Sequence, residues 1–146
     1  MTPIREQVFA TIKTNLEAIG GFTVLRNPRR EVRDDQMPAL VLFDGGQQSP
    51  ALWSGSKQYT ATATVEVYVT GATEDLGADL NDAYAQVIQA MEGDPTLGGI
   101  ALHVEEGAMV EPETPLEEGW AAYMGAAVEF TVTYATEETD PYTAAG

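Results

Sequence analysis

Cysteine is absent from this sequence, and histidine occurs once. The lack of cysteine excludes disulfide bonds, thiolate nucleophiles and zinc sites built on thiolates. No apolar run approaches the ~18 residues that a membrane-spanning helix requires. Residues 1–12 mix charged with apolar side chains and lack the apolar core of a signal peptide. We therefore expect a protein that matures in the cytoplasm and has no contact with a membrane.

Basic side chains are few and confined to one part of the chain. Seven lysines and arginines stand against 23 acidic residues, for a net charge of -16. All seven lie within residues 1–57, beside six acidic residues, whereas residues 58–146 carry 17 acidic side chains and no basic one. The second stretch has no means of gripping DNA phosphates. Either the excess charge serves solubility, or the basic region of one copy meets the acidic surface of another.

Length and periodicity predict a single α+β domain. A chain of 146 residues with 44% hydrophobic and 21% charged residues is typical of one globular domain. Apolar residues recur every three or four positions over 3–19 and 73–91, which predicts two amphipathic helices. Strand patterns occupy residues 22–26, 37–43, 59–70, 100–104 and 120–136.

Two amphipathic helices suffice to cover one face of such a sheet. We therefore predict a mixed, largely antiparallel sheet with both helices packed on one face. The domain is predicted to span residues 1–136, followed by a flexible tail over 137–146. Residues 47–58 and 105–119 are predicted to be loops, and Gly125 is a candidate β-bulge.

Residues that support catalysis are sparse. His103 and Glu105 share one face of a predicted strand and would supply two metal ligands, whereas a site needs three or four. Ser49, Ser54 and Ser56 do not lie in a G-x-S-x-G elbow. The sequence contains no P-loop and no G-x-G-x-x-G motif. An exposed histidine on a strand is the favoured interpretation of His103.

A second kind of candidate site is an interface. Four arginines fall within eight residues, at positions 26–33, and Trp53 interrupts a polar stretch. Arginine and tryptophan are enriched at the centres of protein interfaces. Solvated loops account for these residues equally well. The interface candidates are Arg26, Arg29, Arg30, Arg33, Trp53, Lys57, Glu105, Glu106, Glu111 and Glu113.

Several stretches, in this order, resemble the tail terminator (minor tail) proteins of long-tailed bacteriophages, prophages and gene transfer agents. Each stretch is a packing or turn pattern rather than a catalytic signature, and together they cover most of the chain. They are FTVLRNP (22–28), MPALVLFDGG (37–46), YTATATVEVYVTG (59–71), DLGADLNDAYAQVIQAM (75–91), DPTLGG (94–99), FTVTY (130–134) and DPY (140–142).

The resemblance implies a structural role in the virion without catalytic residues, cofactor or metal. Such proteins form a ring, typically a homohexamer, at the head-proximal end of the tail tube, after assembly in the host cytoplasm. The ring stops tube polymerisation and presents a surface to head completion or connector proteins. DNA passes through its lumen without specific binding. The implied partners are therefore other copies of this chain, the tube protein and a head protein.

In a ring, each contact joins one face of a subunit to a different face of the next. A basic edge over residues 26–33 and an acidic edge over residues 105–118 would favour such closure. The Thr60–Thr70 face and the Gln47–Gln58 segment are further candidates for contacts with the tube or a neighbouring copy. Two alternatives stay open: another virion adaptor (a head–tail connector or tube subunit), or a small metal-dependent hydrolase that uses His103.

Overall fold

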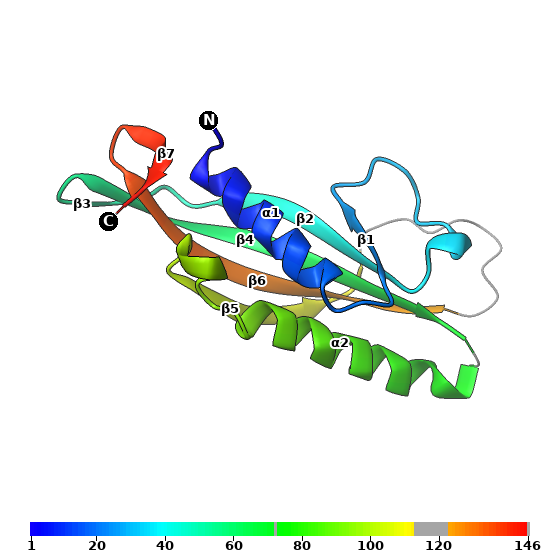
Figure 1. Cartoon of the computed structure of the whole chain (residues 1–146). Coiled ribbons are helices and arrows are strands. Elements are labelled where there is room, and N and C mark those ends of the chain that lie inside the picture. The colour runs from blue at the N-terminus through cyan, green and yellow to red at the C-terminus, as the bar shows by residue number, and fades with distance from the viewer. Residues whose placement is uncertain (72, 113–122, 146) are drawn as a thin grey trace.

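The structure is a computed structural model that describes residues 1–71, 73–112 and 123–145. Three short 3-10 helices, at Asp34–Gln36, Thr73–Asp75 and Leu97–Gly99, join the larger elements. Over the described residues these larger elements are two α-helices and seven strands (Figure 1): α1 (Ile4–Glu17), β1 (Thr23–Arg26), β2 (Ala39–Gln47), β3 (Ala51–Trp53), β4 (Ser56–Thr70), α2 (Leu76–Glu92), β5 (His103–Val110), β6 (Tyr123–Glu137) and β7 (Asp140–Ala144).

All the strands belong to one sheet, with the order β1-β2-β4-β6-β5. The long strands β4 and β6 form its centre and pair without interruption from Ser56–Glu137 to Thr70–Tyr123. Only the β1–β2 pair is parallel, because residues 27–38 cross from the end of β1 back to the level at which β1 began before β2 starts. Strand β3 pairs with β4 on the same side as β2, and β7 pairs with β6 on the same side as β5.

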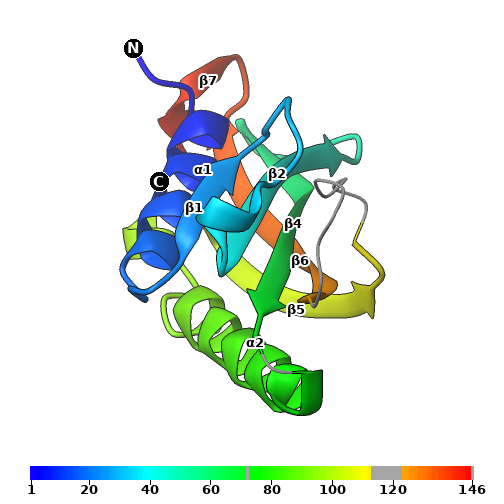
Figure 2. The ribbon, with the colours of Figure 1, turned by 90° about the vertical axis from the view of Figure 1, so that its right-hand side faces the viewer.

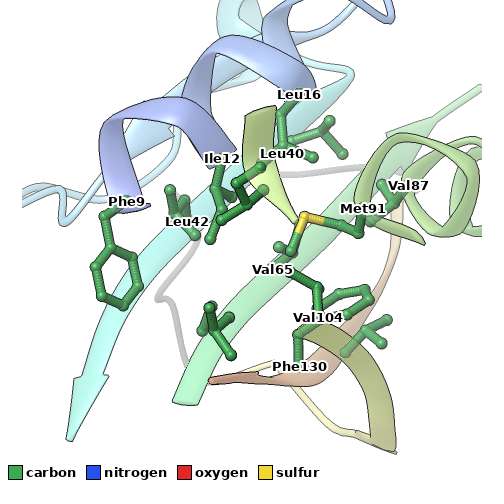
Figure 3. Close-up of a cluster of buried hydrophobic side chains, with 14 of the residues drawn as sticks. Phe9, Ile12, Leu16, Leu40, Leu42, Val65, Val87, Met91, Val104 and Phe130 are labelled. Carbon is green, nitrogen blue, oxygen red and sulfur yellow. The ribbon is translucent and has the colours of Figure 1, made fainter. Parts of the chain in front are cut away.

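Both helices lie on one face of this sheet, as predicted (Figure 2). The alternation of β4 turns Ala61, Ala63, Val65, Val67 and Val69 toward the helices. Figure 3 shows Ile12 and Leu16 of α1 and Val87 and Met91 of α2 meeting strand residues, among them Phe130. The mixed, mostly antiparallel α+β class predicted from periodicity is confirmed.

The opposite face is covered in part by the chain itself. Val32, from the segment between β1 and β2, packs on Ala39, Val41 and Tyr68 in a second small core. Glu66 is buried at 1% exposure beside this core and accepts a hydrogen bond from the Tyr68 hydroxyl at 2.8 Å. A buried carboxylate needs such a donor, since removing it from water is costly. The other half of this face is rich in threonine.

Several predicted boundaries are wrong for a common reason. Strand β2 continues through Asp44–Gln47, where Gly45 passes so near the Thr62 carbonyl that a side chain would collide with it. Part of the predicted loop 47–58 forms the β3–β4 hairpin. Strand β5 occupies His103–Val110 rather than 100–104, so the first part of the predicted acidic loop is strand. Cross-strand pairing overrode weak local patterns in each case.

Pro3 occupies the N-cap of α1, and no side chain caps that helix. Two further details differ from expectation. The β4–β6 register runs unbroken through Gly125, so the predicted bulge is absent there. Strand β7 lies within the predicted tail, and regular structure therefore extends past residue 136. No helix in the described part of the chain is long and apolar enough to cross a membrane.

Candidate functional site

The strand order places the two predicted edges on opposite sides of the sheet. The basic edge, residues 26–33, begins at the last residue of β1, the strand at one border of the sheet. Glu105 and Glu106, at the start of the acidic edge, lie on β5, the opposite border strand. Glu111 follows β5 directly and is exposed. Residues 113–122 lie outside the described part of the chain. They include the candidate Glu113, Glu117 and Glu118 of the predicted acidic edge, and Trp120.

Arg26 does not belong to the free basic surface. Its guanidinium donates two hydrogen bonds to Asp44, at 3.0 and 2.5 Å, and two to Glu6, at 2.8 and 2.9 Å. The hydrogen bonds to Asp44 and then to Glu6 raise the pKa of Arg26. This triad joins β1 to β2 and α1, so Arg26 stabilises the fold.

Removing Arg26 is therefore expected to destabilise the protein. The Arg26→Met variant leaves Asp44 partly buried without its cation, and we expect a loss of about 1.5–3 kcal/mol at neutral pH. Arg33→Met is the matched control, because its ion pair with Asp35 is exposed and is worth ~0–1 kcal/mol. Urea unfolding measures both losses. If Arg26→Met lost no more stability than Arg33→Met, the conclusion that Arg26 stabilises the fold would be wrong.

The same triad predicts a pH dependence. The hydrogen bond from Arg26 lowers the pKa of Glu6 below its ordinary value. A carboxyl with a lowered folded-state pKa contributes stability that is present above its unfolded pKa, about 4.3, and is lost as pH falls through the folded value. The difference in free energy of unfolding between wild type and Arg26→Met should therefore become smaller as the pH falls below about 4.

Arg29 and Arg30 are the exposed cations of the basic edge. Neither forms an ion pair with a residue that the structure describes, whereas Arg33 is paired with Asp35 at 3.1 Å. The positive φ of 46° at Asn27 starts the turn that carries both arginines away from β1. The Asn27 side chain accepts a hydrogen bond from the Asp44 amide and fixes the base of this turn.

On the acidic edge, Glu105 is exposed and Glu106 is held internally. The Tyr84 hydroxyl of α2 donates a hydrogen bond to the Glu106 carboxylate, and this bond raises the pKa of Tyr84. The Glu106 amide donates to Glu92 of α2 at 3.3 Å. These contacts fix β5 against α2. Glu105 and Glu111 are therefore the side chains of this edge most available to a partner.

The β3–β4 hairpin carries a feature that the loop interpretation missed. Leu52 is 67% exposed and Trp53 is 64% exposed, and Gly55 makes the turn with a φ of 82°. Lys57 lies opposite Leu52 on β4. We call Leu52, Trp53 and Lys57 the hairpin tip. The apolar run Ala51–Trp53 was too short to identify a strand from sequence, although a Ser-Gly turn before an alternating strand was present as a signal.

The β6–β7 hairpin lies at the same end of the molecule (Figure 1). It carries Glu137, Glu138, Asp140 and the 41%-exposed Tyr142. The Thr143 hydroxyl and then the Tyr142 amide hydrogen-bond the Asp140 carboxylate and lower its pKa. We call Glu137, Glu138 and Tyr142 the β7 corner. Sequence analysis missed it because the segment has no apolar periodicity.

The catalytic alternative gains no further ligands. His103 and Glu105 are both exposed on the same face of β5. Within the described ranges, no group of three or more histidine, aspartate or glutamate side chains is placed to hold a metal ion.

No family model and no curated protein matches the chain. Among solved structures it is similar to the gp17 protein of bacteriophage SPP1, at a TM-score of 0.49 and 17% identity over 89% of both chains. A likeness at this level concerns the fold alone.

Proposed function

We propose that this chain is a structural protein of a bacteriophage-type virion, and specifically a tail terminator. In this proposal, copies form a ring, typically of six, at the head-proximal end of the tail tube. The ring halts tube growth and offers a surface to a head completion protein. DNA passes through the lumen, and the protein performs no catalysis. The sequence stretches quoted above supply the resemblance behind this role.

The observation that carries the self-association is the placement of the basic and acidic edges on opposite borders of one sheet. A contact between different surfaces of two copies leaves one free surface of each kind at the ends of the pair. Further copies add, and the chain of copies closes as a ring when the rotation between neighbours divides a full turn. Arg29 and Arg30 on one border and Glu105 and Glu111 on the other give this contact opposite charges.

The acidity of the rest of the chain fits a lumen for DNA. Residues 58–146 contain no basic side chain, so the surface they form repels phosphates rather than binding them. DNA that moves through a ring needs a wall to which it does not adhere.

The decisive experiment is the mass of the purified protein in solution, with and without polymerising tail tubes. We expect ring-sized species, or binding at one end of the tubes with arrest of their growth. A chain that stays monomeric and leaves tube growth unchanged contradicts the terminator role. A tube subunit would instead be incorporated along the tube, so electron microscopy of labelled protein separates that adaptor from a terminator.

A further inference from the structure

The hairpin tip is an unusual surface for a chain of this charge. Leu52 and Trp53 are successive strand residues, so their side chains point to opposite faces of the hairpin. Both are about two-thirds exposed. A flat docking partner would cover only one of these faces. The tip therefore fits an occupant that meets it edge-on and reaches both faces.

The β7 corner lies on the opposite border of the sheet at the same level. Trp53 is opposite Ser56, Ser56 is opposite Glu137, and Glu137 is opposite Asp140, which forms one row across four strands. At ~4.8 Å between neighbouring strands, the ends of this row are about 14 Å apart. Trp53 and Asp140 of one copy are therefore too far apart to cover each other, although the bases of the two hairpins meet where the Glu138 amide donates a hydrogen bond to the Gly55 carbonyl at 2.9 Å.

The charges of these two surfaces are complementary. Lys57 is the one basic residue after position 33, and it lies on the same face as Leu52. The β7 corner holds two glutamates beside an exposed tyrosine. This repeats, at one end of the molecule, the opposition of Arg29 and Arg30 to Glu105 and Glu111.

From this arrangement we propose that the hairpin tip of one copy docks edge-on against the β7 corner of the next copy. Leu52 and Trp53 pack about Tyr142 of the neighbour, and Lys57 faces Glu137 and Glu138 of that copy. Each copy in a ring then uses its tip once and its corner once. This inference rests on the proposed ring, for which it names a second contact beside the charged edges.

Single introduced cysteines test the contact, because the chain has none of its own. Leu52→Cys and Tyr142→Cys proteins are mixed under ring-forming conditions and treated with a short bis-maleimide. The mixture should give covalent dimers, and each variant alone should give few. Thr62→Cys, on an exposed site at the centre of the sheet, replaces Tyr142→Cys in the control mixture. We expect about tenfold more dimer in the first mixture than in the control, since the reagent joins only neighbouring side chains.

The possible results separate this contact from the ring itself. Rings that form without Leu52–Tyr142 crosslinks overturn the inference and leave the terminator role standing. Leu52→Cys protein that crosslinks with itself indicates a two-fold contact and also overturns it. A chain that neither forms rings nor arrests tubes removes the proposed function, and the absence of crosslinks then removes this contact as well.

Discussion

Replacing Phe130 by alanine should cost about 3–5 kcal/mol of folding stability, the largest loss that we expect from one substitution. Phe130 has no exposed surface and lies on β6 directly opposite Ala63 of β4 and Glu106 of β5. Its ring fills the space between the sheet and the helices (Figure 3). With small Ala63 as its neighbour, the cavity left behind has little chance of collapsing. Urea unfolding followed by circular dichroism measures the loss.

The matched control is Leu102→Ala, which removes an apolar side chain that is 52% exposed. Substitutions at exposed positions usually change stability by less than about 0.5 kcal/mol. Equal losses at the two positions would show that Phe130 does not anchor the core.

The long elements were predictable because their periodicity extends over many residues. Twelve residues of β4 alternate in polarity, and the apolar stripe of α1 repeats over four turns. Such patterns record which side chains are buried against the rest of the protein. The same burial stabilises the helix or strand, so the pattern predicts the element. Each helix has one apolar stripe, and the sheet has one largely apolar face. Few arrangements other than the observed two layers bury all of these surfaces.

The short elements were not predictable, since their partners rather than their own residues define them. Ala51–Trp53 becomes a strand because β4 extends beyond the core and offers an unpaired edge. Asp140–Ala144 pairs with β6 in the same way, although it begins with Asp-Pro. Both segments lie at the protruding end of the sheet, where burial is low and the apolar signal is weak.

The candidate interface was predictable in composition but not in detail. Four arginines close together in the sequence separate into three roles: Arg26 in an internal triad, Arg33 in a local pair, and Arg29 and Arg30 as exposed cations. The partners Glu6 and Asp44 are 20 and 18 residues from Arg26, so local sequence does not reveal them. Only the strand order shows that the basic and acidic edges are opposite.

Reversing the charge of either edge should abolish assembly, and combining the two reversals should restore it. Arg29→Glu with Arg30→Glu makes both borders of the copy acidic, and Glu105→Arg with Glu111→Arg makes both borders basic. Like charges brought together at an interface cost several kcal/mol, so each double variant alone should associate about 100-fold more weakly. Mixed in equal amounts, the two variants should alternate around a ring, because every contact then joins opposite charges.

Light scattering at low and high salt checks this result. At ~1 M salt the Debye length is about 3 Å, and the differences between the variants should largely disappear. Glu17→Arg with Asp79→Arg is the control, since it changes the net charge by the same amount as Glu105→Arg with Glu111→Arg, at exposed positions on the two helices. If that control assembles as wild type does and the mixed variants do not, the edges are not the contact. If the mixture alone recovers, the ring must contain an even number of copies, as alternation requires and as a ring of six permits.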